Sequence, residues 1–479
     1  MRRVATALAA AALLGGCVDL APAYHRPAPP VPASFPAGPA YPPAPGAATP
    51  IVGWRDFFSD PKLNRIIEEA LANNRDLRIA VANIAAARAQ YHVQRAALFP
   101  TIAATASATY AQEPLSVVEG GPLAPGQSAT YNERLYNLGA GVTSWQLDLF
   151  GKTRNLTRAA QDQYFATRQA RDAAQITLVG EVATDYLTLS SDRSLLAIAR
   201  ATLKSGQASL DLTEARLNAG VASALDVEQA KTTVQQARYD AARLTTLVAQ
   251  DRNAVELVAG APVADSDLPP ELDGDVVVLD RLPAAVSSTV LLDRPDVLQA
   301  EDALRATNAN IGAARANFFP SISLTGSGGL TSLALSSLFQ GSAATWTFIP
   351  TVSQTIFDFG ANRGNLAYAK AQRDVSVAQY EKAIQTAFRE VADALAQRGT
   401  IDEQVAAQGA LTEASHQSLI LATARYERGA DTYLNVLIAQ RSYYGAQQTL
   451  VSTRLARSLN LVTLYGALGG GLDAPRPGA

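Results

Sequence analysis

Residues 181–220 read EVATDYLTLSSDRSLLAIARATLKSGQASLDLTEARLNAG, and this stretch decides the fold. Leucines stand seven residues apart in it, at Leu189, Leu196, Leu203, Leu210 and Leu217. After Gly220 the same spacing continues with smaller apolar residues, at Val227, Val234, Ala241, Val248 and Val255. Two such seams that flank a glycine predict an antiparallel coiled-coil hairpin. An ordinary buried helix stripe is the alternative, but consecutive matches on both sides of the turn favour the coiled coil.

The stretch belongs to an internal duplication. Glu181-Val182-Ala183 recurs 209 residues later as Glu390-Val391-Ala392, and Arg216 and Gly220 recur with the same offset as Arg425 and Gly429. A second set of matches flanks the first: Phe99-Pro100 with Phe319-Pro320, and Asp148-Leu149-Phe150-Gly151 with Asp358-Phe359-Gly360. The Phe-Pro pairs lie 220 residues apart. The first copy therefore holds about 11 additional residues before Gly151, which we expect in a loop. A repeat of this size indicates a duplicated architectural unit.

The proline distribution allows each copy to hold very long helices. No proline lies between Pro125 and Pro262, or between Pro350 and Pro475, and proline breaks helix interiors. The segment from Gly151 to Gly220 would be about 100 Å long as a helix. Shorter helices are expected from Pro61, after an Asp60 cap, to about Leu98, and from Pro295 to about Asn317.

Four segments read as strands, two in each copy. They are residues 101–112, 136–150, 321–328 and 345–359. The last alternates best, with Trp346, Phe348, Val352 and Ile356 on one face and Thr345, Thr347, Thr351, Ser353 and Thr355 on the other. A strand with one apolar and one hydroxyl-rich face suits a barrel wall between lipid and water, although a soluble sandwich is the alternative. Four strands cannot close a barrel in lipid, so if these strands span a membrane, several chains must share one barrel, and three chains would give twelve strands.

The N-terminus reads as a targeting segment. Residues 1–16 form a signal peptide, with Arg2 and Arg3 before an apolar run, and Leu14-Gly15-Gly16-Cys17 resembles a bacterial lipobox. Cys17, the only cysteine, is then the lipid acceptor. Residues 17–60 form a proline-rich N-terminal segment, read either as an extended tether or as a disordered linker. The first repeat covers 61–259, an equatorial linker 260–293, the second repeat 294–468 and a C-terminal tail 469–479.

Composition gives no sign of nucleic-acid binding or catalysis. The net charge is −3 and no basic run occurs. His25, His92 and His416 are far apart and show no metal-ligand spacing. Gly151-Lys152-Thr153 looks like the end of a phosphate-binding loop, but Gln146 stands where that loop needs glycine. We therefore expect no enzyme activity, no metal and no cofactor besides the lipid on Cys17.

Several longer stretches, taken in order, resemble one family. They are residues 54–61 (WRDFFSDP), 294–297 (RPDV), 311–320 (IGAARANFFP), 429–434 (GADTYL) and 464–471 (LYGALGGG). The chain resembles the TolC-type outer-membrane efflux channels, in their lipoprotein (NodT-like) branch. The resemblance implies an α+β membrane protein: a homotrimer with a 12-stranded β-barrel and a coiled-coil α-barrel. It also implies a passive duct for small molecules, docked to a periplasmic membrane-fusion adaptor and an inner-membrane RND-type pump.

The resemblance places functional residues at the two helical turns. Adaptor-docking tips fall at Arg216, Leu217, Gly220, Val221, Ala222, Ser223, Arg425 and Gly429, although the glycines also serve simply as helix breaks. Gate positions fall at Asp226, Tyr426, Asp431, Asn435 and Ile438. Asp226 and Tyr426 match a family Asp–Tyr link, whereas Asp431 replaces an arginine, and two aspartates repel. The family's acidic ring falls at Asn435 and Ile438, so an apolar narrowing that includes Ile438 is the alternative.

Two other readings compete with the efflux channel. A structural periplasmic coiled-coil lipoprotein that acts as a spacer explains the lipobox and the heptads, but not residues 345–359. A secreted enzyme with coiled-coil arms lacks any catalytic constellation. The sequence does not specify the cargo, and Met1 is the only methionine, so the mature duct has no thioether ligands for soft metals.

Overall fold

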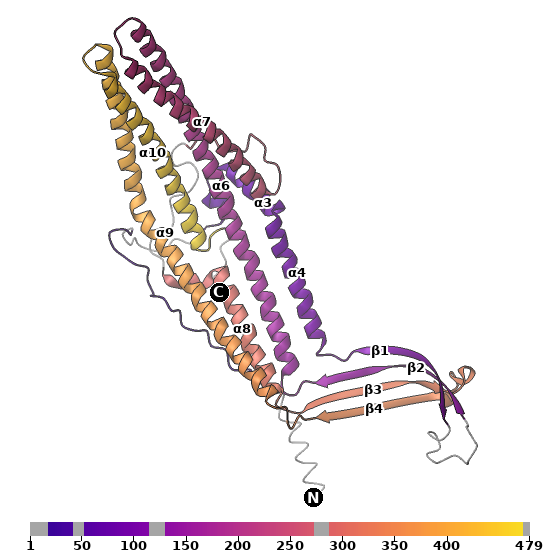
Figure 1. Cartoon of the computed structure of the whole chain (residues 1–479). Coiled ribbons are helices and arrows are strands. Elements are labelled where there is room, and N and C mark those ends of the chain that lie inside the picture. The colour runs from indigo at the N-terminus through magenta and orange to yellow at the C-terminus, as the bar shows by residue number, and fades with distance from the viewer. Residues whose placement is uncertain (1–17, 42–51, 115–129, 273–286, 473–479) are drawn as a thin grey trace. The chain divides into compact units, whose positions relative to one another are not determined.

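The structure is a computed structural model that describes residues 18–41, 52–114, 130–272 and 287–472 (Figure 1). Cys17, and with it the predicted lipidation site, lies outside the described residues. The chain forms two compact units. Unit 1 comprises Met1–Arg26, Ala85–Phe165 and Asp302–Ala378, and unit 2 comprises Pro27–Ile84, Ala166–Glu301 and Gln379–Ala479. Each unit therefore draws residues from both copies of the sequence repeat.

The two longest helices confirm the proline argument and the duplication. Helix α6 (Lys152–Asn218) and helix α9 (Ala361–Glu427) each have 67 residues. Each is followed by a shorter helix, α7 (Ala224–Ala259) after the first and α10 (Tyr433–Ala467) after the second. None of the helices in the described part of the chain is long and apolar enough to cross a bilayer.

The repeated Asp…Gly motif explains where α6 and α9 begin. Asp148 accepts hydrogen bonds from the backbone N–H groups of Thr153 (3.2 Å) and Arg154 (2.8 Å). Asp358 accepts them from Gly360 and Asn362, both at 2.9 Å. In each copy a carboxylate thus satisfies backbone N–H groups that a helix N-terminus leaves without partners. The glycines of the motif, with φ 74° and 93°, turn the chain into the helix.

The single helix expected from Pro61 to about Leu98 is wrong, because the chain breaks at Asn74. Helix α3 covers Pro61–Asn73 and helix α4 covers Arg75–Ala96. Asn74 is extended, with ψ 134°. Its side chain accepts a hydrogen bond from the N–H of Leu77 (3.0 Å) and donates one to the carbonyl of Val258 (3.0 Å). An asparagine side chain that replaces backbone partners competes with helix continuation.

The remaining helices agree with expectation: Asp60 caps α3 through the N–H of Lys62 (2.8 Å), and α8 covers Pro295–Ala316.

Unit 1 contains a four-stranded antiparallel sheet in the order β1-β2-β3-β4 (Figure 1). The strands are β1 (Ile102–Pro114), β2 (Thr130–Leu147), β3 (Ser321–Ser332) and β4 (Ala344–Ser353). All four predicted strands exist, but several bounds differ: β2 begins before residue 136 and ends before 150, β3 continues past 328, and β4 ends at Ser353 rather than at 359. Strand β4 ends early because Phe359, at φ 52°, and the Asp358 cap already belong to the turn into α9.

The strand register separates apolar from hydroxyl-bearing residues. Directly paired residues share a face of the sheet. One face carries the pairs Leu147–Ile322 and Ile322–Val352, and further along Ile102–Val142 and Gly326–Phe348. The other face carries Ser327–Thr347, Gly329–Thr345, Gly139–Gly329 and Thr105–Gly139. The alternation predicted for β4 thus extends to its neighbours, with exceptions such as Ile349, which pairs with Thr325 on the hydroxyl-rich face. The apolar face is uncovered in the single chain, where the side chain of Trp346 is 79% exposed and that of Val352 is 67% exposed.

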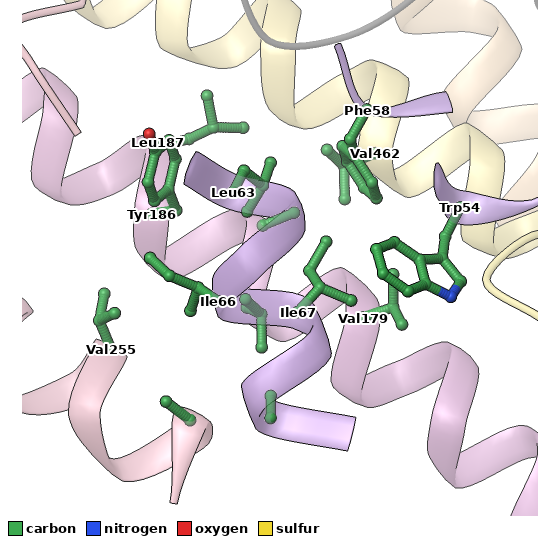
Figure 2. Close-up of a cluster of buried hydrophobic side chains, with 14 of the residues drawn as sticks. Trp54, Phe58, Leu63, Ile66, Ile67, Val179, Tyr186, Leu187, Val255 and Val462 are labelled. Atoms are coloured by element: carbon green, nitrogen blue, oxygen red, sulfur yellow. The ribbon is translucent and has the colours of Figure 1, made fainter. Parts of the chain in front are cut away.

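The main hydrophobic core lies in unit 2 and joins the start of the chain to its later helices (Figure 2). Trp54 and Phe57 of the short helix α2 (Trp54–Phe57) are buried with residues of α3, α6, α7 and α10. The Tyr186 hydroxyl donates a 2.6 Å hydrogen bond to Asp60, which ties α6 to the cap of α3. The predicted seams face inward: Leu189, Leu196, Leu210, Val227, Val234 and Val255 are buried.

The described parts of the segment expected to be a linker pack against the core. Val263, Leu268 and Leu272 are buried in the same cluster. Ser190 of α6 donates to the carbonyl of Pro270 (2.8 Å), and the N–H of Leu272 donates to the hydroxyl of Ser194 (2.6 Å). Residues 260–272 are therefore bound along α6. Further on, residues 288–293 form a short 3-10 helix before α8.

The proline-rich N-terminal segment is extended where the structure describes it. Its residues 27–41 lie on unit 2, where Ser34 forms a β-bridge with Ser287 and the ring of Phe35 stacks on that of Phe388 at 4.9 Å. Residues 18–26 lie on unit 1. Residues 18–41 thus pack on the folded units without forming a helix, the extended tether stays a prediction, and residues 42–51 lie outside the described residues.

Asp162 of α6 is a half-buried carboxyl that opposes folding when ionised. Burial and the nearby charge of Asp302 raise its pKa to about 6, against the opposing charges of Arg305 and Arg158. A folded-state pKa above the ordinary aspartate value of 3.8 means that the ionised form is disfavoured in the folded protein. Stability should therefore be lowest above pH 6 and rise as the pH falls from about 6 to about 4.

We expect Asp162→Asn to stabilise the protein by about 1 kcal/mol at neutral pH, after allowance for partial solvent exposure. The variant should also lose the part of the pH dependence that Asp162 causes. Thermal unfolding of wild type and variant in detergent, followed across this pH range, measures both effects. Parallel pH profiles for the two proteins would contradict the assignment.

Candidate functional site: the paired helical tips

The turn between α6 and α7 forms the first tip, in unit 2. The N–H of Val221 donates to the carbonyl of Arg216 (2.9 Å), and the N–H of Gly220 donates to that of Leu217 (2.9 Å). These two bonds and φ 76° at Gly220 form a Schellman motif. Helix α7 then begins with a capping box, in which Asp226 accepts from the N–H of Ser223 (2.9 Å) and Ser223 accepts from that of Asp226 (3.2 Å).

The second tip, between α9 and α10, repeats the first turn with a different helix start. The N–H of Ala430 donates to the carbonyl of Arg425 (2.9 Å), and Gly429 takes φ 74°. Thr432 at the start of α10 makes no side-chain cap. Asn435, at the position equivalent to Asp226, instead donates to the carboxylate of Asp431 (2.6 Å). The duplication thus preserves the backbone turn and varies the side chains that it presents.

One apolar cluster holds both tips together. It contains the buried residues Leu210, Val227, Ala230, Val234, Tyr433, Val436 and Leu437, with Leu203, Leu217, Leu419, Ala422 and Tyr426 partly buried against it. At its edge the guanidinium of Arg216 lies 4.4 Å from the centre of the Tyr426 ring. The rings of Tyr426 and Tyr433 are 5.4 Å apart. The two hairpins of one chain therefore form a single packed end, and a cation–π contact bridges them.

The acidic gate positions have partners within the chain. Asp431 accepts a 3.1 Å hydrogen bond from Arg425 in addition to those from Asn435 and from the N–H of Thr432. The hydrogen bond from Asn435, followed by those from Thr432 and Arg425, lowers the pKa of Asp431. Asp226 is held in its capping box. The family arginine missing at position 431 is thus compensated locally, because Arg425 supplies the opposite charge from the preceding helix.

Tyr426, which matches the tyrosine of the family Asp–Tyr link, lies against Arg216 and Tyr433 in the single chain, and its pairing with Asp226 stays a prediction. Sequence reasoning assigned Arg216 and Arg425 to docking and missed their contacts with Tyr426 and Asp431. Both arginines occupy the same position of the same motif, four residues before the glycine, but their partners differ, so the repeat alone does not identify these contacts.

Apolar side chains project from the tips without cover from the same chain. Val221 is 73% exposed, Leu225 66% and Ile438 57%. Leu434 and Asn435 are exposed one turn before Ile438 on α10. The helices hold these side chains in place, because their neighbours on the opposite face, Val436 and Leu437, are buried in the tip cluster. The arrangement suits contact with another chain or an apolar narrowing.

The fold defines the class of protein: an internally duplicated α+β chain whose sheet has one apolar and one hydroxyl-rich face, with paired helical hairpin tips. The chain belongs to the outer membrane efflux protein family. The sequence model of this family matches residues 66–261 and 286–470. The two matched ranges follow the two repeats. The chain is an outer-membrane component of efflux, and its fold class is that of the TolC-type outer-membrane channels.

Curated relatives and solved structures agree with this assignment. The chain is 45% identical to the toluene efflux pump outer membrane protein TtgC of Pseudomonas putida, over 96% of this chain and 93% of the relative. The antibiotic efflux pump outer membrane protein ArpC of the same species gives the same identity and coverage. The open-state MtrE outer membrane channel of Neisseria gonorrhoeae superposes with a TM-score of 0.84 at 36% identity, over 95% of this chain and 99% of that one.

Proposed function

We propose that three copies of this chain close a twelve-stranded barrel and form a passive duct through the outer membrane. The four-stranded sheet carries the proposal. Within one chain β1 and β4 are terminal strands, and an open edge is not tolerated in lipid. The apolar face would meet lipid, and the face with Thr105, Ser327, Thr345 and Thr347 would line the water-filled interior. Closure between three chains satisfies both edges of every sheet.

The partners follow from the tips and from the N-terminus. We propose that the exposed tip residues, with Val221 and the turns at Gly220 and Gly429, dock a periplasmic membrane-fusion adaptor that links the duct to an inner-membrane RND-type pump. The lipid on Cys17 anchors the chain in the outer membrane. A duct of this kind has no catalytic role, and it uses no cofactor besides its lipid.

The gate is proposed to lie at the tips, with Ile438 as an apolar narrowing and the contacts Arg425–Asp431 and Arg216–Tyr426 as restraints. Removing Ile438 from the narrowing and Arg425 from its ion pair should loosen the tip without touching the core. The spacer reading of the chain requires neither a sheet with two chemically different faces nor a narrowing, so a conductance measurement separates the two functions.

We expect the wild-type protein to pass little current in planar bilayers, and the double variant Ile438→Ala with Arg425→Ala to raise the conductance several-fold. Leu411→Ala removes an equally apolar side chain, 54% exposed on α9 away from the turn, and serves as the matched control. If the protein stays monomeric and forms no channels, the result would favour the structural spacer over the duct. Channels of equal conductance in all three proteins would refute the proposed gate and leave the duct.

The cargo is proposed to be small toxic compounds, including aromatic solvents. A relative at 45% identity is named for toluene efflux and another for antibiotic efflux. The wild-type protein and the variants used for conductance also test the cargo. Each is expressed in a strain that lacks its own outer-membrane efflux protein, and survival in toluene is measured. Restored survival in toluene supports the proposal, and unchanged sensitivity from a channel-forming protein contradicts it.

A further inference from the structure

Residues 18–24, here called the N-terminal strap, pack against the end of strand β2 and against helices α6 and α8 of unit 1. The N–H of Val18 donates to the carbonyl of Leu149, just beyond β2 (3.2 Å). Arg315 of α8 donates to the carbonyl of Leu20 (3.0 Å), and Asn308 of α8 donates to that of Pro22 (2.8 Å). Side chains of the folded body thus satisfy backbone carbonyls of a segment that has no secondary structure of its own.

Asp19 is the charged centre of the strap. One carboxylate oxygen accepts from Asn155 of α6 (2.9 Å) and from the N–H of Ala21 (3.0 Å), and the other accepts from Arg158 of α6 (2.8 Å). Burial alone would raise the pKa of Asp19, but the hydrogen bonds from Ala21, Arg158 and Asn155 outweigh it and lower the pKa to about 2. Asp19 therefore stays ionised, and bound to α6, at any physiological pH.

A glycine inside α8 makes room for the strap. A Cβ atom added at Gly312 would lie 2.6 Å from Nδ2 of Asn155 and 2.7 Å from the backbone nitrogen of Ala21. Helix propensity favours alanine over glycine at an interior position, so the glycine is explained by the close approach of the strap and its partner. By contrast, a Cβ atom at Gly409 inside α9 would have no atom within 4 Å.

We propose that Asp19 is a positioning residue that fixes the N-terminus of the mature chain, with the lipid on Cys17, at the end of strand β2. The proposal rests on the proposed lipidation. Val18, whose N–H is bonded to the carbonyl of Leu149, is the residue that follows Cys17 in the sequence. The acyl chains then enter the bilayer beside the end of the sheet, so that anchor and sheet insert into the same stretch of membrane. A free strap would let the lipid attach without directing the sheet.

The test compares Asp19→Asn and Gly312→Ala with the control Gly409→Ala, each as purified full-length lipoprotein with the lipid confirmed by mass spectrometry. Asparagine keeps the size of Asp19 and removes its charge, whereas alanine at Gly312 removes the room for the strap and favours helix α8. We expect amide hydrogen exchange over residues 18–24 to rise about ten-fold or more in the two test variants. Exchange in α6 and α8 should stay unchanged, and the control should match wild type.

A second measurement separates positioning from mere attachment. The rate at which the sheet becomes protected from protease after addition of phosphatidylethanolamine–phosphatidylglycerol vesicles should fall several-fold in both test variants and not in the control. Unchanged exchange in both variants would overturn the strap, and faster exchange with a wild-type insertion rate would overturn its positioning role. An unmodified Cys17 in the mass spectrum would refute the lipidation instead, and the two failures are therefore distinguishable.

Discussion

Replacing Arg294 with alanine is expected to destabilise unit 2 by about 2–3 kcal/mol, because it removes several charge-assisted hydrogen bonds and leaves the carbonyl of the buried Ala467 without its donor. Arg294 is only 9% exposed. It donates to Asp296 at the start of α8 (2.8 and 3.0 Å), to Glu390 of α9 (2.8 Å) and to the carbonyl of Ala467 at the end of α10 (2.6 Å). A single guanidinium thus joins three helices, and its rigid fork cannot be replaced by lysine without losing bonds.

The free energy of unfolding from urea titrations in detergent measures this loss. Arg65→Ala is the matched control, since Arg65 forms an ion pair with Asp267 at 2.7 Å but is itself 59% exposed. An exposed pair contributes at most about 1 kcal/mol. Equal losses in Arg294→Ala and Arg65→Ala would show that the three-helix contact is not stabilising. Arg294→Lys should lie between alanine and wild type.

The duplication gives Arg294 a counterpart with different chemistry. Asn74 precedes Arg294 by 220 residues, the offset of the Phe-Pro pairs, and Val258 precedes Ala467 by 209, the offset of the tips. Asn74 donates to the carbonyl of Val258 as Arg294 donates to that of Ala467. The same backbone carbonyl near the end of the second hairpin helix is therefore bound from the same point in both copies, by an amide in one and by a guanidinium in the other.

This pair shows what could be predicted from the sequence and what could not. Proline spacing and repeat offsets predict α6, α9 and the two turns, because helix breakers and left-handed glycines act locally. The break at Asn74 was missed because it depends on Val258, which is remote in sequence. Likewise, the alternation at residues 345–353 predicts the faces of β4, whereas its end depends on the cap that Asp358 provides for α9.

At the tips, too, some features could be predicted from the sequence and others could not. Gly220 and Gly429 were identified from the repeat, and their positive φ values follow from the residue type. The contact of Tyr426 with Arg216 follows from how the two hairpins pack, which no local pattern encodes. Arg425 lies six residues before Asp431, on the other side of a turn whose geometry brings the two together at 3.1 Å. The local compensation for the missing family arginine was therefore visible only in three dimensions.

Replacing Trp54 with alanine is expected to cost about 3–5 kcal/mol, as for other large aromatic side chains removed from a core. Trp54 is fully buried and lies near Val179 of α6 in the unit 2 core (Figure 2). One helical turn later, the ring of Phe57 stacks on that of Tyr465 in α10 at 3.8 Å. Loss of the indole would leave a cavity where α2 packs against α6 and α10, and the short helix α2 has too few residues to close it.

Urea titration of Trp54→Ala in detergent, followed by far-ultraviolet circular dichroism, measures this cost. Tyr239→Ala on α7 is the control, because Tyr239 is 63% exposed and its removal should change the free energy of unfolding by less than about 0.5 kcal/mol. Trp54→Phe should lose less than alanine, since most of the apolar volume stays. The residues of the tip cluster belong to a different cluster from Trp54, so loss of Trp54 should raise hydrogen exchange in α2 and α3 before it does so near Gly220. Loss of stability that begins at the tips, or an alanine variant as stable as wild type, would contradict the role assigned to this core.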